Sequence, residues 1–320
     1  MVITALLVYA ALGTGVSVAE RARPFRIGAL TQSWGPTPMI VGMRDGLLEF
    51  GYREDVDFFL GVRFTQGNIN ALDAAAHELV QYGVDLIFVD SDASARAAQR
   101  ATSQIPIVFA TVADPLGMGL VQSFARPGGN ITGVTDMELH LGPKRLQVFK
   151  EIIPHLQRVL FPYDVANVYA VAMSKVYRDA ARKLGMTLVE KVLRTQEEAR
   201  AVLAQIRKSD VDGILSPWST SLNIPGFILE AAAQQGIPTM FSSAFFLEEQ
   251  GALASYAPDT FGTGKQAARL VDKILKGAKP ADIPVEVNAK IEFVINLKAA
   301  KALGLTIAPE VLYQADRLIR

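Results

Sequence analysis

Short apolar runs alternate with segments of helical spacing along the chain, and this alternation limits its folds more than any other feature. The extended runs of the first half are Arg26–Leu30, Phe58–Phe64, Leu86–Val89 and Ile107–Phe109. The helical segments between them are Met39–Phe50, Ile69–Tyr82 and Ala93–Thr102. Strands that alternate with helices of about ten residues form βαβ units, which give a parallel sheet with helices on both faces.

The second half repeats this alternation without close sequence repetition. Its extended runs are Val159–Phe161, Thr187–Leu193, Gly213–Leu215 and Thr239–Phe241. Its helical segments are Leu141–Ile153, Ala172–Leu184, Glu197–Lys208 and Ile224–Gln235. A chain of 320 residues has room for two lobes that each bury a core. We therefore predict an α/β fold with two doubly wound parallel-sheet lobes.

The segment Ile274–Ile307 departs from this pattern near the end of the chain. A helix stops at Gly277, and the extended runs Val285–Val287 and Ile291–Ile295 precede a short helix at Leu297–Leu303. Extended runs placed straight after a helix suit a chain that crosses between two lobes. The apolar, turn-flanked segments that we expect to cross are Asn130–Asp136, Leu253–Asp259 and Val285–Phe293.

The same C-terminal segment carries a family resemblance, together with Asp114-Pro115, Gly119–Val121 and Arg126–Val134. These residues closely resemble the periplasmic substrate-binding proteins of ABC importers of the tryptophan/tyrosine-binding type. The resemblance extends from roughly Arg26 to the C-terminus and is strong for the family but weak for the ligand.

The resemblance implies a type I periplasmic binding fold, in which three crossover strands join the lobes. Periodicity alone would not give that number. We expect lobe I to comprise residues 25–135 and 257–286, and lobe II residues 136–256 and 287–320. The resemblance also implies an ABC permease in the inner membrane as the partner.

The N-terminal residues have the composition of an export signal. Val2–Leu12 is apolar but too short to span a bilayer, which takes about 20 apolar residues. Ser17 and Ala19 fit a small-x-small cleavage site. No Lys or Arg lies within Met1–Gly15, so the alternatives are a start further upstream or an uncleaved apolar terminus. We expect residues 1–19 to be a signal peptide outside the fold.

Composition limits the compartment and the partners. The chain has no Cys, which excludes a lipobox thiol, a disulfide and thiolate catalysis. We therefore expect an unlipidated protein of a Gram-negative periplasm. Lys plus Arg and Asp plus Glu both number 32, without a run of like charge, which argues against nucleic-acid binding. We expect a soluble monomer.

Candidate ligand-binding residues follow from the predicted sheet topology. In a doubly wound sheet, the carboxyl ends of the strands and the N-termini of the following helices meet at one edge. Helix N-termini leave free backbone N–H groups that suit a carboxylate. The candidates that fall at this edge are Gln32, Ser33, Trp34, Ser91, Asp92, Ala93, Thr111, Asp114, Tyr163, Asp164, Trp218, Ser219, Thr220, Ser242 and Tyr256.

The candidate set is rich in hydroxyls and aromatic rings, contains several Asp, and holds no Lys, Arg or His. These groups fit a small zwitterion with an apolar side chain, best an aromatic or branched apolar amino acid. Asp164 or Asp92 is our candidate partner for the ammonium group. A sugar or nucleoside-like ligand would use the same aromatic faces and remains an alternative. A phosphate ligand would favour Arg.

Structural roles compete with ligand contact at several of these positions. Trp34 and Trp218 also suit a core, and Ser91, Ser219 and Asp92 also suit helix N-caps. Asp114 precedes Pro115 and also suits an Asp-Pro turn.

The residues of most enzyme sites are absent. His77, His140 and His155 have no metal-ligand or triad spacing. No Gly-x-Ser-x-Gly motif is present, and Gly262–Lys265 lacks the Ser or Thr that a phosphate loop requires. We expect neither an enzyme, a cofactor nor a metal. The main alternative is a periplasmic ligand-sensing subunit that reports to a membrane receptor.

Overall fold

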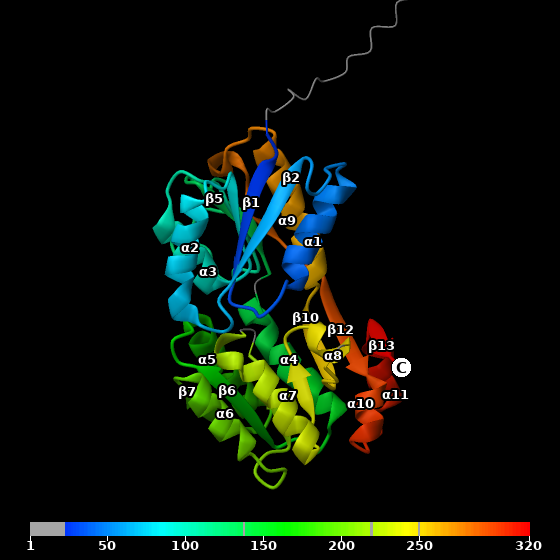
Figure 1. Ribbon diagram of the computed structural model, residues 1–320. Coiled ribbons are helices and arrows are strands. Elements are labelled where there is room, and N and C mark those ends of the chain that lie inside the picture. Colours follow the sequence, from blue (N-terminus) through cyan, green and yellow to red (C-terminus); the bar gives the residue numbers. More distant parts are fainter. Residues whose placement is uncertain (1–22, 137, 218–219, 249) are drawn as a thin grey trace, which may run out of the picture.

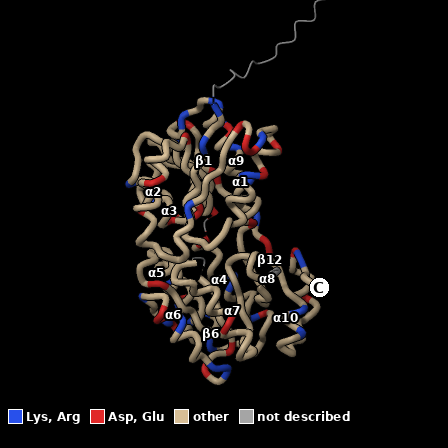
Figure 2. Tube along the Cα trace, in the orientation of Figure 1, with Lys and Arg blue, Asp and Glu red and all other residues tan. Residues whose placement is uncertain are grey.

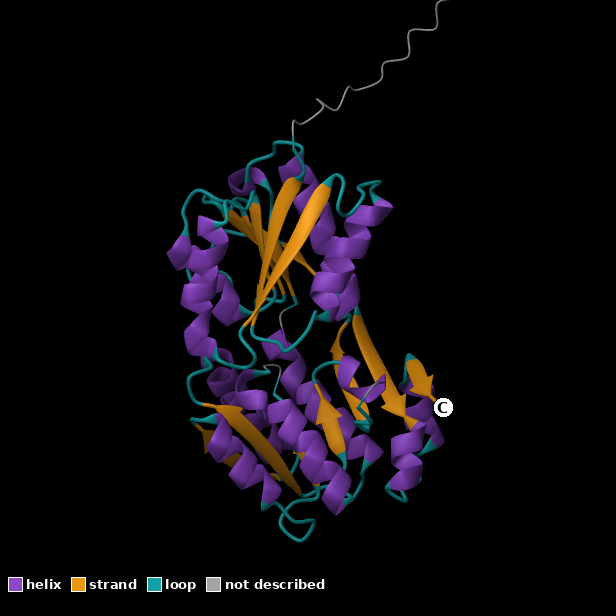
Figure 3. Ribbon diagram, viewed as in Figure 1, coloured by secondary structure: helices purple, strands orange, loops and turns teal. Residues whose placement is uncertain are grey.

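The computed structural model describes residues 23–136, 138–217, 220–248 and 250–320. Two α/β lobes lie one above the other, and helices flank a central sheet in each (Figures 1 and 3). The predicted signal peptide lies outside the described residues. Within the described part, no helix combines the length and the apolar character that a membrane crossing needs. Basic and acidic residues are mixed over both lobes (Figure 2).

The first lobe contains a six-stranded parallel sheet with the order β11-β5-β4-β3-β1-β2. Its strands are β1 Phe25–Thr31, β2 Phe58–Phe64, β3 Leu86–Val89, β4 Ile107–Ala110, β5 Ile131–Thr135 and β11 Glu286–Val287. Its helices are α1 Pro38–Glu49, α2 Leu72–Gln81, α3 Asp92–Ala101 and α9 Thr260–Leu275, with 3₁₀ turns η1 Ile69–Ala71 and η4 Pro280–Asp282.

Both faces of this sheet are buried because side chains alternate between them along each strand. Leu86 and Phe88 of β3 join the cluster formed with α1 and α9. Ile87 and Val89 join the cluster formed with α2 and α3. The nearly continuous apolar runs in the sequence are therefore those of strands covered on both sides.

The second lobe contains a seven-stranded sheet with the order β13-β12-β10-β9-β8-β6-β7. Its strands are β6 Arg158–Asp164, β7 Thr187–Leu193, β8 Gly213–Leu215, β9 Thr239–Phe241, β10 Ala254–Pro258, β12 Ile291–Asn296 and β13 Arg317–Ile319. Its helices are α4 Gly142–Ile152, α5 Val168–Lys183, α6 Gln196–Ala204, α7 Ile224–Gln235, α8 Phe245–Glu248, α10 Leu297–Ala302 and α11 Pro309–Gln314. Its 3₁₀ turns are η2 Glu138–Leu141 and η3 Ser221–Asn223.

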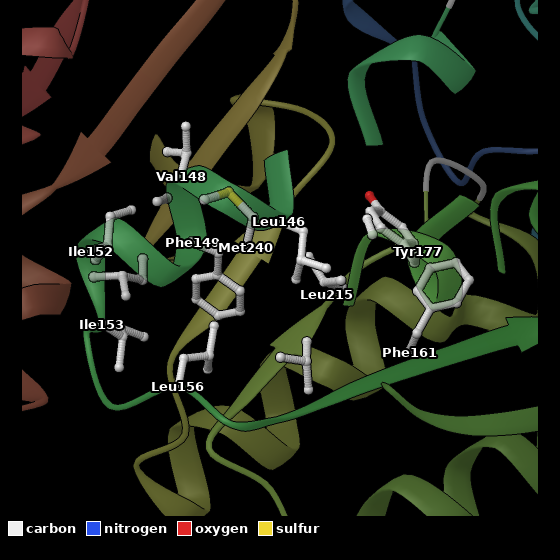
Figure 4. Packing of buried hydrophobic residues seen from close by; sticks show 14 of the residues in the cluster. Leu146, Val148, Phe149, Ile152, Ile153, Leu156, Phe161, Tyr177, Leu215 and Met240 are labelled. Carbon is white, nitrogen blue, oxygen red and sulfur yellow. The ribbon is translucent and has the colours of Figure 1, made fainter. Parts of the chain in front are cut away.

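Helices α4 and α5 cover one face of this second sheet, and α6 and α7 cover the other. Figure 4 shows Phe149 of α4 beside Met240 of β9. The rings of Phe161 and Tyr177 pack edge to face with centroids 5.0 Å apart (Figure 4). The core of this lobe thus supports α4 and α5.

The predicted fold class is confirmed, with one addition at the C-terminal edge. Strand β12 runs antiparallel to β10, whereas the other paired strands of both sheets run parallel. The sequence did not lead us to expect α8, α11 or β13. These elements are short, and β13 pairs with β12 only after the chain has returned to the second lobe.

The chain passes between the two sheets three times, and the three crossings lie side by side. The first follows β5 at Asp136, the second joins β10 to α9 at Asp259, and the third joins β11 to β12. Asn288 connects all three: its N–H donates to the Thr135 carbonyl at 2.7 Å, and its side-chain amide donates to the Asp259 carbonyl at 3.1 Å.

The segments that we expected to cross mostly belong to one sheet each. Strand β5 pairs only within the first sheet and β10 only within the second, and the third segment divides into β11 and β12. The crossings themselves are the short links that follow or join these strands. The exact residue boundaries of the two lobes stay a prediction.

Helices α1 and α9 approach each other through glycines. A Cβ on Gly264 would lie 2.2 Å from the carbonyl oxygen of Met39, and one on Gly42 would lie 2.2 Å from that of Phe261. Backbone atoms cannot rotate away from such a contact as a flexible side chain can. The sequence therefore fixes the separation of the two helices at these positions.

We predict that Gly264→Ala destabilises the protein by about 1–3 kcal/mol, because the added methyl group forces the two helices apart. Thermal unfolding of the purified variant measures this change. The control is Gly61→Ala on β2, where an added Cβ has no neighbour within 4 Å. A Gly264→Ala variant as stable as the parent would contradict the close packing of α1 on α9.

Candidate functional site

A cavity of about 280 Å³ lies between the two lobes. The first lobe lines it with residues 31–39, Asp90, Ser91 and Thr260. The second lobe lines it with Thr220, Asn223, Pro225, Gly226, Ser243, Phe245, Phe246 and Gln250. Small-molecule pockets measure about 300–1,000 Å³, so this volume suits a small ligand.

Hydroxyl groups shape the turn between β1 and α1. The Ser33 N–H donates to Thr31 Oγ1 at 3.1 Å, and the Gly35 N–H donates to Ser33 Oγ at 3.3 Å. Thr37 caps α1 and Pro38 occupies its first turn, so the helix begins at the cavity wall. This local chemistry holds the turn in a fixed shape without a glycine-rich loop.

Asp90 is the one charged residue among the described residues that line the cavity, and only 4% of it is exposed. Its Oδ2 accepts a hydrogen bond of 2.7 Å from the hydroxyl of Thr37. Burial raises the pKa of the Asp90 carboxyl to about 6, while hydrogen bonds from Thr37 and Thr31 oppose the rise. The cavity thus holds one negative charge at neutral pH, and a cationic group would stabilise it.

The N-terminus of α3 lies beside Asp90. Ser91 is the N-cap, with its hydroxyl accepting from the Ser94 N–H at 3.2 Å and Ser94 Oγ accepting from the Ser91 N–H at 3.1 Å. The capping role that the sequence offered for Ser91 is therefore present, and Ser91 also lines the cavity. The helix terminus places partial positive charge at the cavity wall.

Apolar walls come from both lobes. Trp34 of the first lobe is 42% exposed and packs so closely on Gly67 that a Cβ there would lie 2.5 Å from the indole Cη2. Phe245 and Phe246 of the second lobe meet edge to face with centroids 5.4 Å apart. The cavity therefore has aromatic surface from both lobes, and its one charged group among the described lining residues, Asp90, belongs to the first lobe.

A strained turn of the second lobe reaches the first lobe. Leu222 and Asn223 have φ values of 54° and 53°, which is the left-handed region that side chains other than glycine rarely adopt. The Leu222 N–H donates to the carbonyl of Gly67 at 3.2 Å and so links the lobes at the edge of the cavity.

Asp164 holds this turn in place. Only 3% of Asp164 is exposed; its Oδ1 accepts from the Ala166 N–H at 2.8 Å, and its Oδ2 accepts from the Ser221 hydroxyl. Asp164 does not line the cavity, so these contacts give its carboxylate a structural role and leave it away from the place where an ammonium group would bind.

Asp92 also has a protein partner. Its Oδ1 accepts from the Ala113 N–H at 3.2 Å, and it does not line the cavity. Burial raises the pKa of Asp92 to about 7; the hydrogen bond from Ala113 opposes the rise, and the nearby carboxylates of Asp136 and Asp114 add to it. Both Asp92 and Asp164 are therefore poorer partners for an ammonium group than Asp90.

The structure brings five of the predicted residues together at the cavity and leaves eight elsewhere. Those at the cavity are Gln32, Ser33, Trp34, Ser91 and Thr220. Those that do not line it are Asp92, Ala93, Thr111, Asp114, Tyr163, Asp164, Ser242 and Tyr256. Trp218 and Ser219 lie outside the described residues.

Besides Asp92 and Asp164, four of the eight residues away from the cavity have identifiable surroundings. Thr111 is buried with a φ of 66°, and its hydroxyl donates to the Asp90 carbonyl at 3.0 Å. Asp114 forms the turn that the sequence analysis gave as its alternative, structural role, and its Oδ1 accepts a hydrogen bond from the Gly117 N–H at 2.8 Å. Tyr163 is buried in the core against Phe161, and Tyr256 lines a separate hollow with Lys144.

Sequence reasoning left several lining residues out of the predicted set, among them Thr37, Asp90, Asn223, Phe245, Phe246 and Gln250. Thr37 before Pro38 is an N-cap pattern that could have been recognised in the sequence. Asn223 before Pro225, at the start of α7, is a similar pattern. Gln250 follows the short helix α8, which the sequence pattern did not predict. Within the described part, no group of three or more His, Cys, Asp or Glu has metal-site geometry.

Comparison with known proteins identifies the family. The family described as ABC transporter substrate binding protein matches residues 37–319. The chain belongs to this family. The predicted family membership is therefore confirmed, and the family consists of solute-binding proteins that typically act outside the cytoplasm.

Three relatives of this substrate-binding protein are similar over most of its length. The tyrosine-binding protein of Clostridioides difficile (strain R20291) is 29% identical over 265 residues, which are 82% of this chain and 76% of the relative. A conserved domain protein of Vibrio cholerae has a TM-score of 0.83 and 28% identity, covering 92% of this chain and all of its own. An ABC domain from Streptococcus pneumonia, solved in complex with L-Trp, has a TM-score of 0.82 and 27% identity, covering 93% of this chain and all of its own.

We predict that Asp164→Ala lowers the free energy of unfolding by about 1–3 kcal/mol, because the Ala166 N–H and the Ser221 hydroxyl lose a buried acceptor. Urea unfolding followed by circular dichroism measures the change. Asp179→Ala, which removes an exposed carboxylate from α5 of the same lobe, serves as the control. Equal stability of the two variants would show that the Asp164 contacts do not hold the turn.

Proposed function

We propose that this protein is the solute receptor of an ABC importer and that it captures an aromatic amino acid in the cavity between its lobes. The observation that carries the proposal is the cavity lining: one buried carboxylate, a helix N-terminus with hydroxyl groups, and aromatic walls from both lobes. No Lys, Arg or His accompanies them among the described lining residues. The relatives named for tyrosine and solved with L-Trp support this ligand class.

The three kinds of group match the three parts of an amino acid. Asp90 would receive the ammonium group, which keeps the buried carboxylate ionised. The N-terminus of α3 at Ser91 would receive the carboxylate. The aromatic side chain would lie between Trp34 and Phe245, where ring contacts add to the burial of apolar area.

Closure about the three crossings is the proposed mechanism of capture. A ligand that touches Trp34 of the first lobe and Phe245 of the second has more contacts when the lobes are together, and it therefore stabilises that arrangement. Micromolar affinity corresponds to about −8 kcal/mol.

We further propose that the protein acts in the periplasm and delivers its ligand to a membrane permease. A sensing subunit would use the same closure but a different partner.

We predict that calorimetry of the purified protein detects saturable binding of tyrosine, tryptophan or phenylalanine and that Asp90→Asn weakens it about 10–100-fold. The substitution keeps the shape and the hydrogen bond from Thr37 but removes the charge opposite the ammonium group, which is worth about 1.5–3 kcal/mol. Asp73→Asn, an exposed carboxylate paired with Arg100, is the matched control.

One result would contradict the proposed role of Asp90, and another the proposed ligand class. Unchanged affinity in Asp90→Asn would exclude Asp90 as the partner of the ammonium group. Saturable binding of a sugar or nucleoside, with no heat from any amino acid, would establish the alternative ligand class.

We predict that Trp34→Ala weakens the binding of an aromatic amino acid about tenfold, because one wall of the cavity loses its ring. Trp34→Phe retains a ring at the same place and should stay within about threefold of the parent, given that ring contacts add only about 0.5–1.5 kcal/mol. Calorimetry of both variants with the same amino acid measures the difference. Equal losses in the two variants would argue against ring contact as the source of the affinity.

A further inference from the structure

Two tight turns, one from each lobe, touch at the edge of the cavity. The first-lobe turn follows β2, and its Asn68 N–H donates to the Thr65 carbonyl at 2.9 Å. Its two central residues, Gln66 and Gly67, have φ values of 50° and 80°. Two consecutive residues of positive φ are the signature of a type I′ turn, which favours Gly, Asn and Asp at its centre.

The second-lobe turn is η3, and it has the same form. The Ile224 N–H donates to the Ser221 carbonyl, and both central residues, Leu222 and Asn223, have positive φ. The left-handed region is sterically unfavourable for a leucine, so a leucine persists there only where its surroundings hold it. We call these two turns, residues 65–68 and 221–224, the junction.

The hydrogen bond from the Leu222 N–H to the Gly67 carbonyl joins the two halves of the junction at 3.2 Å. Gly67 follows β2 of the first sheet, and Leu222 precedes α7, which covers the second sheet. No crossing links the two turns, because the chain crosses between the lobes at β5, β10 and β11–β12. An opening of the cavity at this edge therefore separates them and breaks this bond.

The contacts beside the crossings behave differently. Arg145 of α4 forms an ion pair with Glu138 of η2 and donates to the Tyr256 carbonyl of β10 at 2.7 Å. All three residues belong to the second lobe, so these bonds persist when the lobes part. The junction bond reports on the contact between the lobes, and the Arg145 bonds do not.

Trp34 packs on the first-lobe turn. A Cβ on Gly67 would lie 2.5 Å from Cη2, 3.1 Å from Cζ2 and 3.3 Å from Cζ3 of the indole. The turn is also bonded to the segment that precedes Trp34: the Gly67 N–H donates to the Gln32 carbonyl at 2.6 Å, and the Thr65 N–H donates to the Thr31 carbonyl at 3.0 Å. Position 67 thus requires glycine twice, for its backbone conformation and for the ring that lies on it.

We propose that Gly67 is a positioning residue that couples the ring of a bound ligand to the contact between the lobes. The inference rests on the proposed capture of an aromatic ligand between Trp34 and Phe245. A ligand ring that holds the indole in place also holds the turn on which the indole packs. The Gly67 carbonyl then stays in reach of the Leu222 N–H, so ligand binding and the junction bond stabilise each other.

Gly51 provides a matched control for a substitution at Gly67. It has a φ of 89°, and among the described residues no atom lies within 4 Å of an added Cβ. Gly51→Ala therefore introduces the backbone strain of a positive φ without touching an aromatic ring. Similar thermal unfolding of Gly51→Ala and Gly67→Ala will show that both variants are folded and equally strained.

Calorimetry with whichever of tyrosine, tryptophan and phenylalanine the parent binds most tightly tests the role of Gly67. We expect Gly67→Ala to lower the affinity about tenfold and Gly51→Ala to stay within about twofold of the parent, because only the first displaces the indole. In a Trp34→Ala background, Gly67→Ala should add less than about twofold, because the ring that it displaces is absent. Additive losses, or an unchanged affinity in Gly67→Ala, would overturn the inference.

Amide hydrogen exchange followed by NMR tests the junction without a ligand. The Leu222 amide bonds to the other lobe, whereas the Asn223 amide bonds to the Thr220 carbonyl at 3.1 Å and is the internal control. In the ligand-free protein we expect the Leu222 amide to exchange at least about threefold faster in Gly67→Ala than in the parent, with the Asn223 amide unchanged. Equal Leu222 exchange in the two proteins would contradict the role of Gly67.

The same measurement with ligand tests the coupling. Saturation with the amino acid should slow the Leu222 amide at least about tenfold in the parent and less than about threefold in Trp34→Ala. Equal slowing in both would overturn the coupling through Trp34. If no aromatic amino acid binds the parent, the proposed function fails, while faster Leu222 exchange in ligand-free Gly67→Ala still supports the positioning role of Gly67.

Discussion

The arrangement of this protein depends on the way its three crossings are held together. Asn288 bonds the first and second crossings from the side of the first lobe, and Arg145 bonds them to the body of the second. Each lobe has its own core, and these polar contacts join the lobes together with the hydrogen bond from the Leu222 N–H to the Gly67 carbonyl at the edge of the cavity. A buried polar network of this kind is costly to break at one partner.

The two walls of the cavity are also held in place by specific contacts. One wall is carried by α1 and α9, whose glycines fix their separation, and the other by the strained turn that Asp164 holds. Among the described residues that line the cavity, Asp90 is the one charged residue, and its burial raises the pKa of its carboxyl.

Much of the fold was predictable because strands covered on both faces give apolar runs that are easy to recognise. Strands β3, β7, β8 and β9 and helix α7 have the bounds that the sequence predicts. The antiparallel pairing of β12 and the existence of the edge strand β13 were harder to predict, since the pairing partners are distant in sequence. The candidate site was predicted in part: topology brought Trp34, Ser91 and Thr220 to one edge. Topology could not show that the Asp164 carboxylate accepts a hydrogen bond from Ser221 while Asp90 lines the cavity.

The sequence by itself determined the α/β alternation, the two-lobe size, the family and the edge of each sheet that lies at the cavity, because periodicity and turn residues act locally. Only the tertiary structure decided which carboxylates are buried beside one another and which line the cavity. Those properties depend on side-chain direction and desolvation at contacts between segments far apart in the chain. Asp90 and Asp92 are two residues apart in the sequence, yet Asp90 lines the cavity, whereas Asp92 accepts a hydrogen bond from the Ala113 N–H.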